Sequence, residues 1–184
     1  SRGIVTVRRD NCPYVKEVVG GVIDILLEQK SVEKAIEFAK IKISDMAYNR
    51  IPIDKFIISK MLRDSYNNEN LPHVALAKKL ELRDPMNFPK SGERVRYVII
   101  KKSGNKQYEK SEDPEYAIEH HLKLDIMEYW NHQIKKPLIK TLEILVDNPE
   151  TLFEEYERIM LNVQRDNSMI TDYFKSSVKV FNKW

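Results

Sequence analysis

The sequence predicts a mainly helical α+β fold, and three observations support this prediction. Apolar residues recur at spacings of three and four over most of the chain, which is the period of amphipathic helices. Two short stretches instead alternate or group β-branched and aromatic residues, as strands do. Finally, 42% of the 184 residues are hydrophobic, which is enough for the core of one domain with appendages.

The N-terminal part is predicted to hold a short strand and two helices. A β-branched run over residues 4–7 predicts the strand. Asn11 is expected to cap the first helix, which has Pro13 in its first turn and an apolar face as far as Gln29. Ser31 is expected to cap the second helix, which carries the same spacing of apolar residues.

The middle of the chain is predicted to form two strands separated by a helix. Residues 55–62 predict the first strand, and residues 71–83 predict the helix. Residues 94–100 alternate charged or aromatic with aliphatic side chains, so they predict a strand whose polar side shows Arg94 and Arg96.

Three further helices are predicted in the C-terminal part. Residues 112–122 predict a short helix, and an apolar stripe over residues 127–145 predicts a long one. Pro137 lies inside that stripe and removes one backbone hydrogen bond, so we expect a kink there. The pair Asn148-Pro149 is a suitable cap and first turn for the last helix.

Composition excludes several classes of protein. Cys12 is the only cysteine, which excludes a disulfide framework or a CxxC zinc site and predicts a reducing, intracellular setting. No apolar run approaches the roughly 18 residues of a membrane span, so no membrane partner is expected. The chain begins Ser-Arg-Gly within a strand-like run, and we expect it to be a piece of something longer.

No sequence motif predicts an active site or a metal site. A Gly-rich phosphate loop, a His-Glu metal motif and a G-x-S-x-G elbow are all missing. The adjacent pair His120-His121 would point about 100° apart on a helix and cannot share a metal. The acids Glu112, Asp113 and Glu115 fit the first turn of a helix better than an acid–base pair. We therefore predict no catalytic residue and no metal ligand.

The segment between Lys90 and Lys110 is locally basic. The net charge of the chain is only +3, so a nucleic-acid surface requires such clustering. Tyr97 and Tyr108 interleave the cations, as a phosphate-contacting surface would need. The alternative is a solvated hairpin edge protected by lysines, and both interpretations stay open. The cations are Lys90, Arg94, Arg96, Lys101, Lys102, Lys106 and Lys110, against the acids Glu93 and Glu109.

Four segments share their form, order and spacing with segments of one known family. They are GIVTVRRDNCPYV, then FIISKMLRDSY with PHVALAKKLELRDP, then SGERVRYVII, and finally EDPEYAIEHHLKLDIMEYWNHQIKKPL. Together they cover most of residues 3–146 and resemble the end of the palm and the thumb in delta-type subunits of family B DNA polymerases. The resemblance implies a thumb with a small β-hairpin or sheet element, preceded by the last strand and helix of the palm. The implied division is palm over residues 1–30, thumb over 31–161 and a tail over 162–184.

The resemblance also implies which residues face DNA. Arg8 and Arg9 would border the primer-template duplex where palm meets thumb, held by Asp10 in a charge-assisted salt bridge. The alternative for these three is a structural bridge between palm and thumb. A thumb of this kind grips duplex through its backbone and shape rather than its sequence. The other positions assigned to DNA binding are Lys60, His73, Arg94, Arg96 and Tyr97, of which Tyr97 could equally be a packing residue.

Departures from the family pattern limit what this chain can do alone. The metal-binding aspartates of D-x-x-S-L-Y-P and Y-G-D-T-D motifs are missing from the sequence. Phosphoryl transfer needs such carboxylates to hold Mg²⁺, so we expect Mg²⁺ and catalysis in the full polymerase and not in this segment. Two C-terminal cysteine clusters of cellular delta-type subunits are also missing, which favours a viral or divergent enzyme acting in the nucleus or at a viral replication site.

The tail contains NSMITDYFK, in which Ile170, Tyr173 and Phe174 hold the three hydrophobic places of a sliding-clamp-binding peptide. Asn167 replaces the usual Gln. One helical turn would bring the three side chains together as a plug for an apolar pocket. The alternative is a tail that packs onto the thumb. Besides a polymerase thumb, a second hypothesis for the whole chain is a non-catalytic DNA-binding or clamp-binding accessory protein derived from a thumb.

Overall fold

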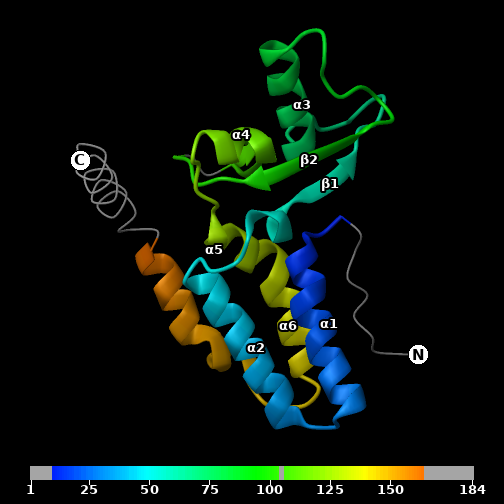
Figure 1. Cartoon of the computed structure of the whole chain (residues 1–184). Coiled ribbons are helices and arrows are strands. Elements are labelled where there is room, and N and C mark those ends of the chain that lie inside the picture. The colour runs from blue at the N-terminus through cyan, green and yellow to red at the C-terminus, as the bar shows by residue number, and fades with distance from the viewer. Residues whose placement is uncertain (1–9, 104–105, 164–184) are drawn as a thin grey trace, which may run out of the picture.

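The computed structural model describes residues 10–103 and 106–163 and confirms a mainly helical α+β fold (Figure 1). A helical bundle occupies one end, and a small three-stranded sheet with two helices occupies the other. The predicted strand over residues 4–7 and residues 164–184 of the predicted tail lie outside the described residues. The bundle contains α1 (Pro13–Glu28), α2 (Val32–Ala47), α5 (Ile126–Tyr129), the π-helical η3 (Trp130–Ile134), α6 (Lys135–Leu142), η4 (Pro149–Phe153) and helical residues 154–163. The sheet region contains η1 (Ile53–Phe56), β1 (Ile58–Met61), α3 (Pro72–Arg83), β2 (Arg94–Ile99), η2 (Gln107–Lys110), β3 (Ser111–Glu112) and α4 (Pro114–Glu119).

Helices α1 and α2 form an antiparallel pair whose ends follow local sequence signals. Ser31 caps α2 as predicted, because its hydroxyl accepts a hydrogen bond from the Lys34 backbone N–H at 3.2 Å. The prediction that Asn11 caps α1 is wrong by one residue. The cap is Cys12, whose backbone N–H donates to Oε1 of Gln133 at 2.9 Å. A distant side chain therefore binds the backbone N–H of the residue at which the helix begins, and no side chain caps α1.

The sheet is antiparallel, in the order β1-β2-β3. The predicted first strand is shorter than expected, because residues 53–56 form the 3₁₀ turn η1 before β1 begins. Strand β2 alternates as predicted, with Arg94 and Arg96 exposed and Val95 and Tyr97 buried. In the register, Arg96 lies opposite Ser59 and Arg94 lies opposite Met61, so these four residues share the exposed face.

The predicted long helix is interrupted, but not in the way that Pro137 alone would cause. Residues 130–134 form a π-helical turn, in which the Lys135 backbone N–H donates to the carbonyl of Trp130. The irregularity therefore lies one turn before Pro137. One carboxylate spans this turn: Oε1 of Glu157 accepts from Nε1 of Trp130 at 2.9 Å and pairs with Nζ of Lys135 at 2.6 Å.

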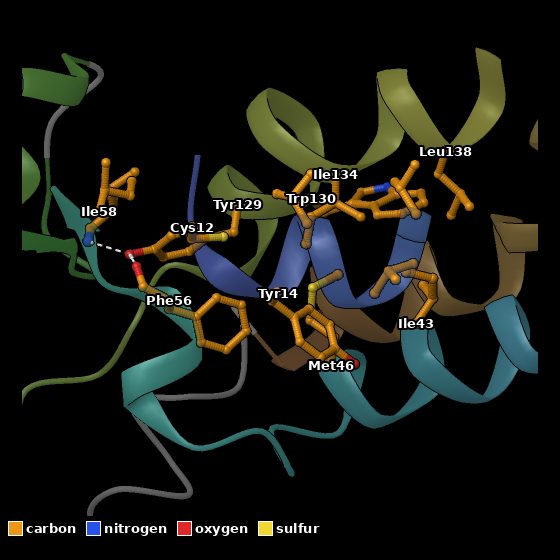
Figure 2. Close-up of a cluster of buried hydrophobic side chains, with 14 of the residues drawn as sticks. Cys12, Tyr14, Ile43, Met46, Phe56, Ile58, Tyr129, Trp130, Ile134 and Leu138 are labelled. Atoms are coloured by element: carbon orange, nitrogen blue, oxygen red, sulfur yellow. Dashed lines mark hydrogen bonds between the residues drawn. The ribbon is translucent and has the colours of Figure 1, made fainter. Parts of the chain in front are cut away.

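The main hydrophobic core continues from the bundle into the sheet, and a smaller second cluster contains Val98, Ile100 and Ala117. Tyr129 lies at the junction: its hydroxyl donates to the carbonyl of Phe56 and accepts from the Ile99 backbone N–H, both at 2.8 Å. Figure 2 shows this ring beside Cys12 and Phe56, with Trp130 and Ile134 deeper in the bundle. The Phe56 and Tyr129 ring centroids are 4.8 Å apart. The two ends of the molecule are thus joined by buried packing and hydrogen bonds.

Candidate nucleic-acid interface

The exposed face of strands β1 and β2 presents two arginines side by side. The Arg94 guanidinium donates from Nε to the Ser59 hydroxyl and from its Nη2 to the Ser59 carbonyl, both at 2.8 Å. No carboxylate pairs with Arg94 among the residues that the structure describes. Ser59 therefore fixes the guanidinium without neutralising it, which leaves a positioned cation at the surface.

Arg96 is held more weakly. Its Nη1 lies 3.3 Å from Oε1 of Glu115 on α4, and both side chains are more than half exposed. Exposed ion pairs of this kind contribute little free energy. A phosphate that approaches this face can therefore compete with Glu115 for the Arg96 guanidinium at small cost.

Lys60 and His73 lie apart from the two arginines. In the register Lys60 is opposite Val95, on the other face of the sheet. His73 is buried on α3, and its Nε2 lies 3.1 Å from the Tyr66 hydroxyl. Burial lowers the pKa of His73, and the positive charges of Lys60 and Arg63 lower it further. The resemblance assigns all three residues to DNA binding, and the sheet places Lys60 on the face opposite to Arg94.

Tyr97 is a core residue, since only 3% of it is exposed. Burial raises the pKa of Tyr97, and the neighbouring Asp10 and Cys12 raise it further. Asp10 and Cys12, just before α1, therefore lie near Tyr97 of strand β2. Asp10 itself is exposed, whereas Arg8 and Arg9 are outside the described part of the chain. So are Ile170, Tyr173 and Phe174.

The basic segment divides into surface and structural cations. Lys110 pairs with Asp125 at 3.2 Å, and both side chains are nearly buried. Lys110 therefore joins η2 to the start of α5 and is not available to a ligand. The members that are exposed are Lys90, Arg94, Arg96, Lys102 and Lys106. The structure therefore separates Lys110 from the exposed cations, and their contact with phosphates stays a prediction.

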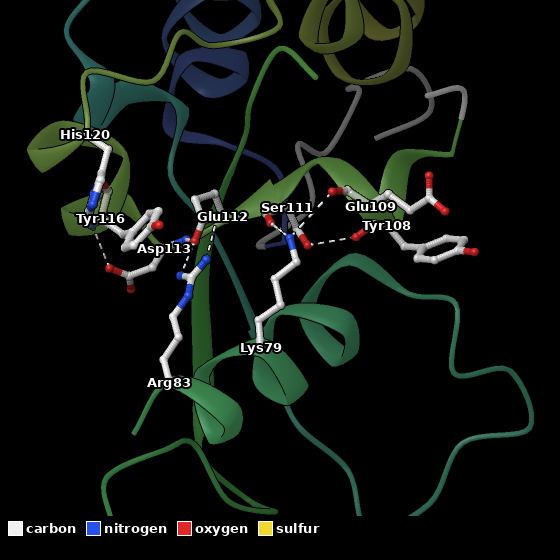
Figure 3. Close-up of polar contacts among 9 residues, drawn as sticks. All are labelled: Lys79, Arg83, Tyr108, Glu109, Ser111, Glu112, Asp113, Tyr116 and His120. Carbon is white, nitrogen blue, oxygen red and sulfur yellow. Dashed lines mark hydrogen bonds and ion pairs between the residues drawn. The ribbon is translucent and has the colours of Figure 1, made fainter. Parts of the chain in front are cut away.

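Sequence reasoning missed a polar clamp between α3 and the β3–α4 segment (Figure 3). Arg83 donates to both carboxylate oxygens of Glu112, at 2.6 and 3.1 Å, and its guanidinium stacks 3.8 Å from the Tyr116 ring centroid. Lys79 donates to the Ser111 carbonyl at 2.9 Å. Burial by itself would raise the pKa of Glu112, but the hydrogen bonds from Arg83 and the Asp113 backbone N–H bring it below its usual value. No local sequence signal marks this pairing, because its partners are 29 residues apart.

Two further observations concern the residues that the structure describes. They contain no group of three or more His, Cys, Asp or Glu side chains placed to hold a metal ion. None of their helices is both long and apolar enough to cross a membrane. His120 and His121 are exposed, and His120 stacks on Tyr116 with centroids 3.9 Å apart.

Comparison with known proteins gives consistent matches. The sequence profile described as DNA polymerase family B matches residues 1–145. The chain is 44% identical over 138 residues to the DNA polymerase delta catalytic subunit of Candida albicans, covering 75% of this chain and 13% of that protein. It is 40% identical over 166 residues to a DNA polymerase of Acanthamoeba polyphaga mimivirus, covering 85% of this chain and 10% of that protein.

The fold has a matching solved structure as well. The family B DNA polymerase from the archaeon Pyrobaculum calidifontis superposes with a TM-score of 0.59 at 26% identity, over 76% of this chain and 18% of that chain. The chain thus spans between a tenth and a fifth of the length of these relatives. The chain belongs to DNA polymerase family B.

Proposed function

We propose that this chain is the end of the palm (residues 1–30) and the thumb (31–161) of a DNA-directed DNA polymerase, and that it grips the primer-template duplex during replication. The observation that carries the proposal is the exposed face of β1 and β2, where Ser59 orients the Arg94 guanidinium beside Arg96. Orienting a cation without neutralising it suits a phosphate contact, because the side chain loses little freedom when the anion arrives.

Such a grip would not depend on sequence. Phosphate contacts set the register of a protein on duplex DNA and carry no base information, which is what an enzyme that copies any template requires. Arg8 and Arg9, only a few residues before α1, would add two more phosphate contacts. The half-buried Lys60, on the other face of the sheet, and the exposed Arg63 would add positive charge beside the duplex next to the buried His73.

Chemistry would reside elsewhere in the polymerase. Carboxylates outside this chain would hold Mg²⁺ for phosphoryl transfer onto the primer 3′ hydroxyl. The remainder of the palm and the fingers would be partners of this segment. The relatives are delta-type catalytic subunits and a viral polymerase, which supports a nuclear or viral replication site. A sliding clamp is the further partner that the tail motif predicts.

The test is the salt dependence of duplex binding. Removing one cation that binds a phosphate should lower the slope of log K against log salt by about 0.9. Arg94→Ala with Arg96→Ala should therefore flatten the slope by about 1.8, and should weaken binding equally on unrelated sequences. The measurement is fluorescence anisotropy with two labelled duplexes, made on the polymerase that carries this segment.

Arg50→Ala is the matched control, because Arg50 is an exposed arginine at the end of α2 that pairs with Asp45 at 3.7 Å. It should leave the slope unchanged. A double variant at Arg94 and Arg96 that keeps the parent slope would show that this face does not contact phosphates.

A further inference from the structure

Helix α4 covers only part of the outer face of strand β2. Arg94, Arg96 and Val98 point to the same side of the strand, because side chains alternate along it. Val98 is buried in one cluster with Ala117 of α4, whereas both arginines are exposed. The exposed face therefore ends at α4, and Glu115 in the first turn of this helix lies at the boundary, within reach of Arg96.

The two arginines are held by partners of different charge. Arg94 donates to the hydroxyl and the carbonyl of Ser59, both at 2.8 Å, and these neutral groups leave its charge in place. Arg96 donates to Oε1 of Glu115 at 3.3 Å, so a carboxylate offsets its charge. A phosphate can thus add to Arg94, but it must displace Glu115 from Arg96.

The backbone of Glu115 is fixed on both sides, so its carboxylate cannot retreat far when it is displaced. Arg83 on α3 binds both carboxylate oxygens of Glu112, at 2.6 and 3.1 Å, and stacks on the Tyr116 ring (Figure 3). The Asp113 carboxylate caps α4 by accepting the Tyr116 backbone N–H at 3.0 Å. After displacement the carboxylate of Glu115 would therefore stay close to the bound phosphate.

Glu115 also adds to the negative charge at the start of α4. Burial raises the pKa of Asp113, and the negative charges of Glu115 and Glu112 raise it further. A DNA phosphate is an anion, so it is repelled by the same carboxylate that it has to displace. Because the side chains of Arg96 and Glu115 are both more than half exposed, salt screens this repulsion.

We infer that Glu115 is a positioning residue that competes with DNA phosphates for Arg96 and thereby limits the affinity of the β1–β2 face for duplex. Arg94 is the constant phosphate contact of this face, and Arg96 is the contact that is readily made and released. This inference rests on the proposed function, because it concerns the same phosphate contacts. A limited affinity suits an enzyme that moves along its product with each nucleotide added, since every step breaks these contacts.

The test is a double-mutant cycle between Glu115 and Arg96, in the polymerase that carries this segment. Glu115→Gln keeps the size of the side chain and removes its charge. We expect it to tighten duplex binding about threefold, which is within the range that exposed ion pairs contribute. In the Arg96→Ala background the same change should have little effect, because energies couple when one residue acts through another. The measurement is fluorescence anisotropy with a labelled duplex.

Glu119→Gln is the matched control, at an exposed residue one turn further along α4. It removes the same charge from the helix but leaves Arg96 with its partner, so its effect should be small and equal with and without Arg96. The gain from Glu115→Gln should also be larger at about 50 mM than at about 200 mM salt. Tighter binding separates this role from a structural one, because a variant that loses its fold would bind duplex more weakly.

The outcomes distinguish the inference from the proposed function. Unchanged or weaker binding in Glu115→Gln, or equal gains with and without Arg96, would overturn the role of Glu115 and leave the arginine contacts standing. If Arg96→Ala alone keeps the parent salt slope, Arg96 makes no phosphate contact and the inference fails with it. The proposed function is then decided separately, by the double variant at Arg94 and Arg96.

Discussion

His73 is a buried titratable side chain with an incomplete set of partners. Its Nε2 faces Tyr66, while its Nδ1 is buried without a hydrogen-bond partner in the structure. Its pKa is lowered by burial and by Lys60 and Arg63, so folding favours the neutral form of the ring. The unfolded chain takes up a proton below about pH 6.5, and stability must therefore fall as the pH drops through that value towards the lower folded pKa.

The expected result is a free energy of unfolding that decreases between about pH 7 and pH 5. His73→Gln should remove this part of the dependence, because the replacement does not titrate. His120→Gln, at the exposed residue that follows α4, is the control for the same change of side chain. Urea unfolding at several pH values measures both, and a parent-like profile in His73→Gln would assign the pH dependence to other groups.

Individual residues were predictable from the sequence where their partners are local. Ser31 and Asp113 cap α2 and α4 through backbone N–H groups three residues ahead, and spacing alone shows such caps. Gln133 and Arg83 bind partners far along the chain, and no spacing rule encodes those. The resemblance named Lys60 and Arg94 together without their faces, because the face of a strand residue follows from the register, which only the structure shows.

At the scale of elements, the contact between α1 and α2 depends on one of two adjacent glycines. A Cβ at Gly21 would lie 2.4 Å from two ring atoms of Phe38 on α2, whereas a Cβ at Gly20 would meet nothing within 4 Å. Gly21 therefore permits the close approach of the two helices, and Gly20 has no such role. Replacing each glycine by alanine therefore makes the same change of side chain at two neighbouring positions, and the two effects on stability can be compared.

Gly20→Ala should raise the free energy of unfolding by about 0.5–1 kcal/mol, because alanine has the higher helix propensity. Gly21→Ala should lower it by about 1 kcal/mol, since overpacking outweighs the same gain. Chemical denaturation measures both changes. Phe38→Leu should restore the Gly21→Ala variant, and equal stabilisation by both alanines would show that the Phe38 ring moves aside without cost.

The type of an element could be predicted from the spacing of its apolar residues, whereas irregular helical geometry could not. The long apolar stripes correctly predicted α1, α2 and α3, because burial of one face dictates a 3.6-residue period. The π turn at Trp130–Ile134 was not predicted. Its cause is the fit among Gln133, Glu157 and their partners, and the only sequence hint, Pro137, lies beyond it.

At the scale of the whole molecule, the tail prediction remains to be tested. Tyr173→Ala with Phe174→Ala should abolish binding to a sliding clamp and leave DNA affinity at low salt unchanged, because the peptide would fill a pocket on the clamp and not touch the duplex. Phe181→Ala is the matched aromatic control outside the motif. Surface plasmon resonance against the clamp and anisotropy against DNA are the measurements, and joint loss of both affinities would identify the tail as structural.

The architecture as a whole could be predicted because the pattern of apolar residues determines which face of each helix or strand is buried. What the sequence did not predict is that one hydrophobic core runs through both ends of the molecule. The side chains that join them, including Tyr129, Phe56 and Ile99, come from three separate segments. A continuous core forms only when separate elements pack together, so it cannot be predicted from any short stretch of the sequence.

The π turn also makes the helical segment tolerant of losing one residue. A turn of this kind accommodates one residue more than a regular α-helix, so deleting one residue between 130 and 134 would let the segment relax into an uninterrupted helix. Leu138 and Leu142, both fully buried, would then keep their orientation towards the core. The same deletion in a regular α-helix would rotate everything beyond it by about 100°. Alignments of related chains should therefore show single-residue gaps at this turn more readily than in α1 or α2.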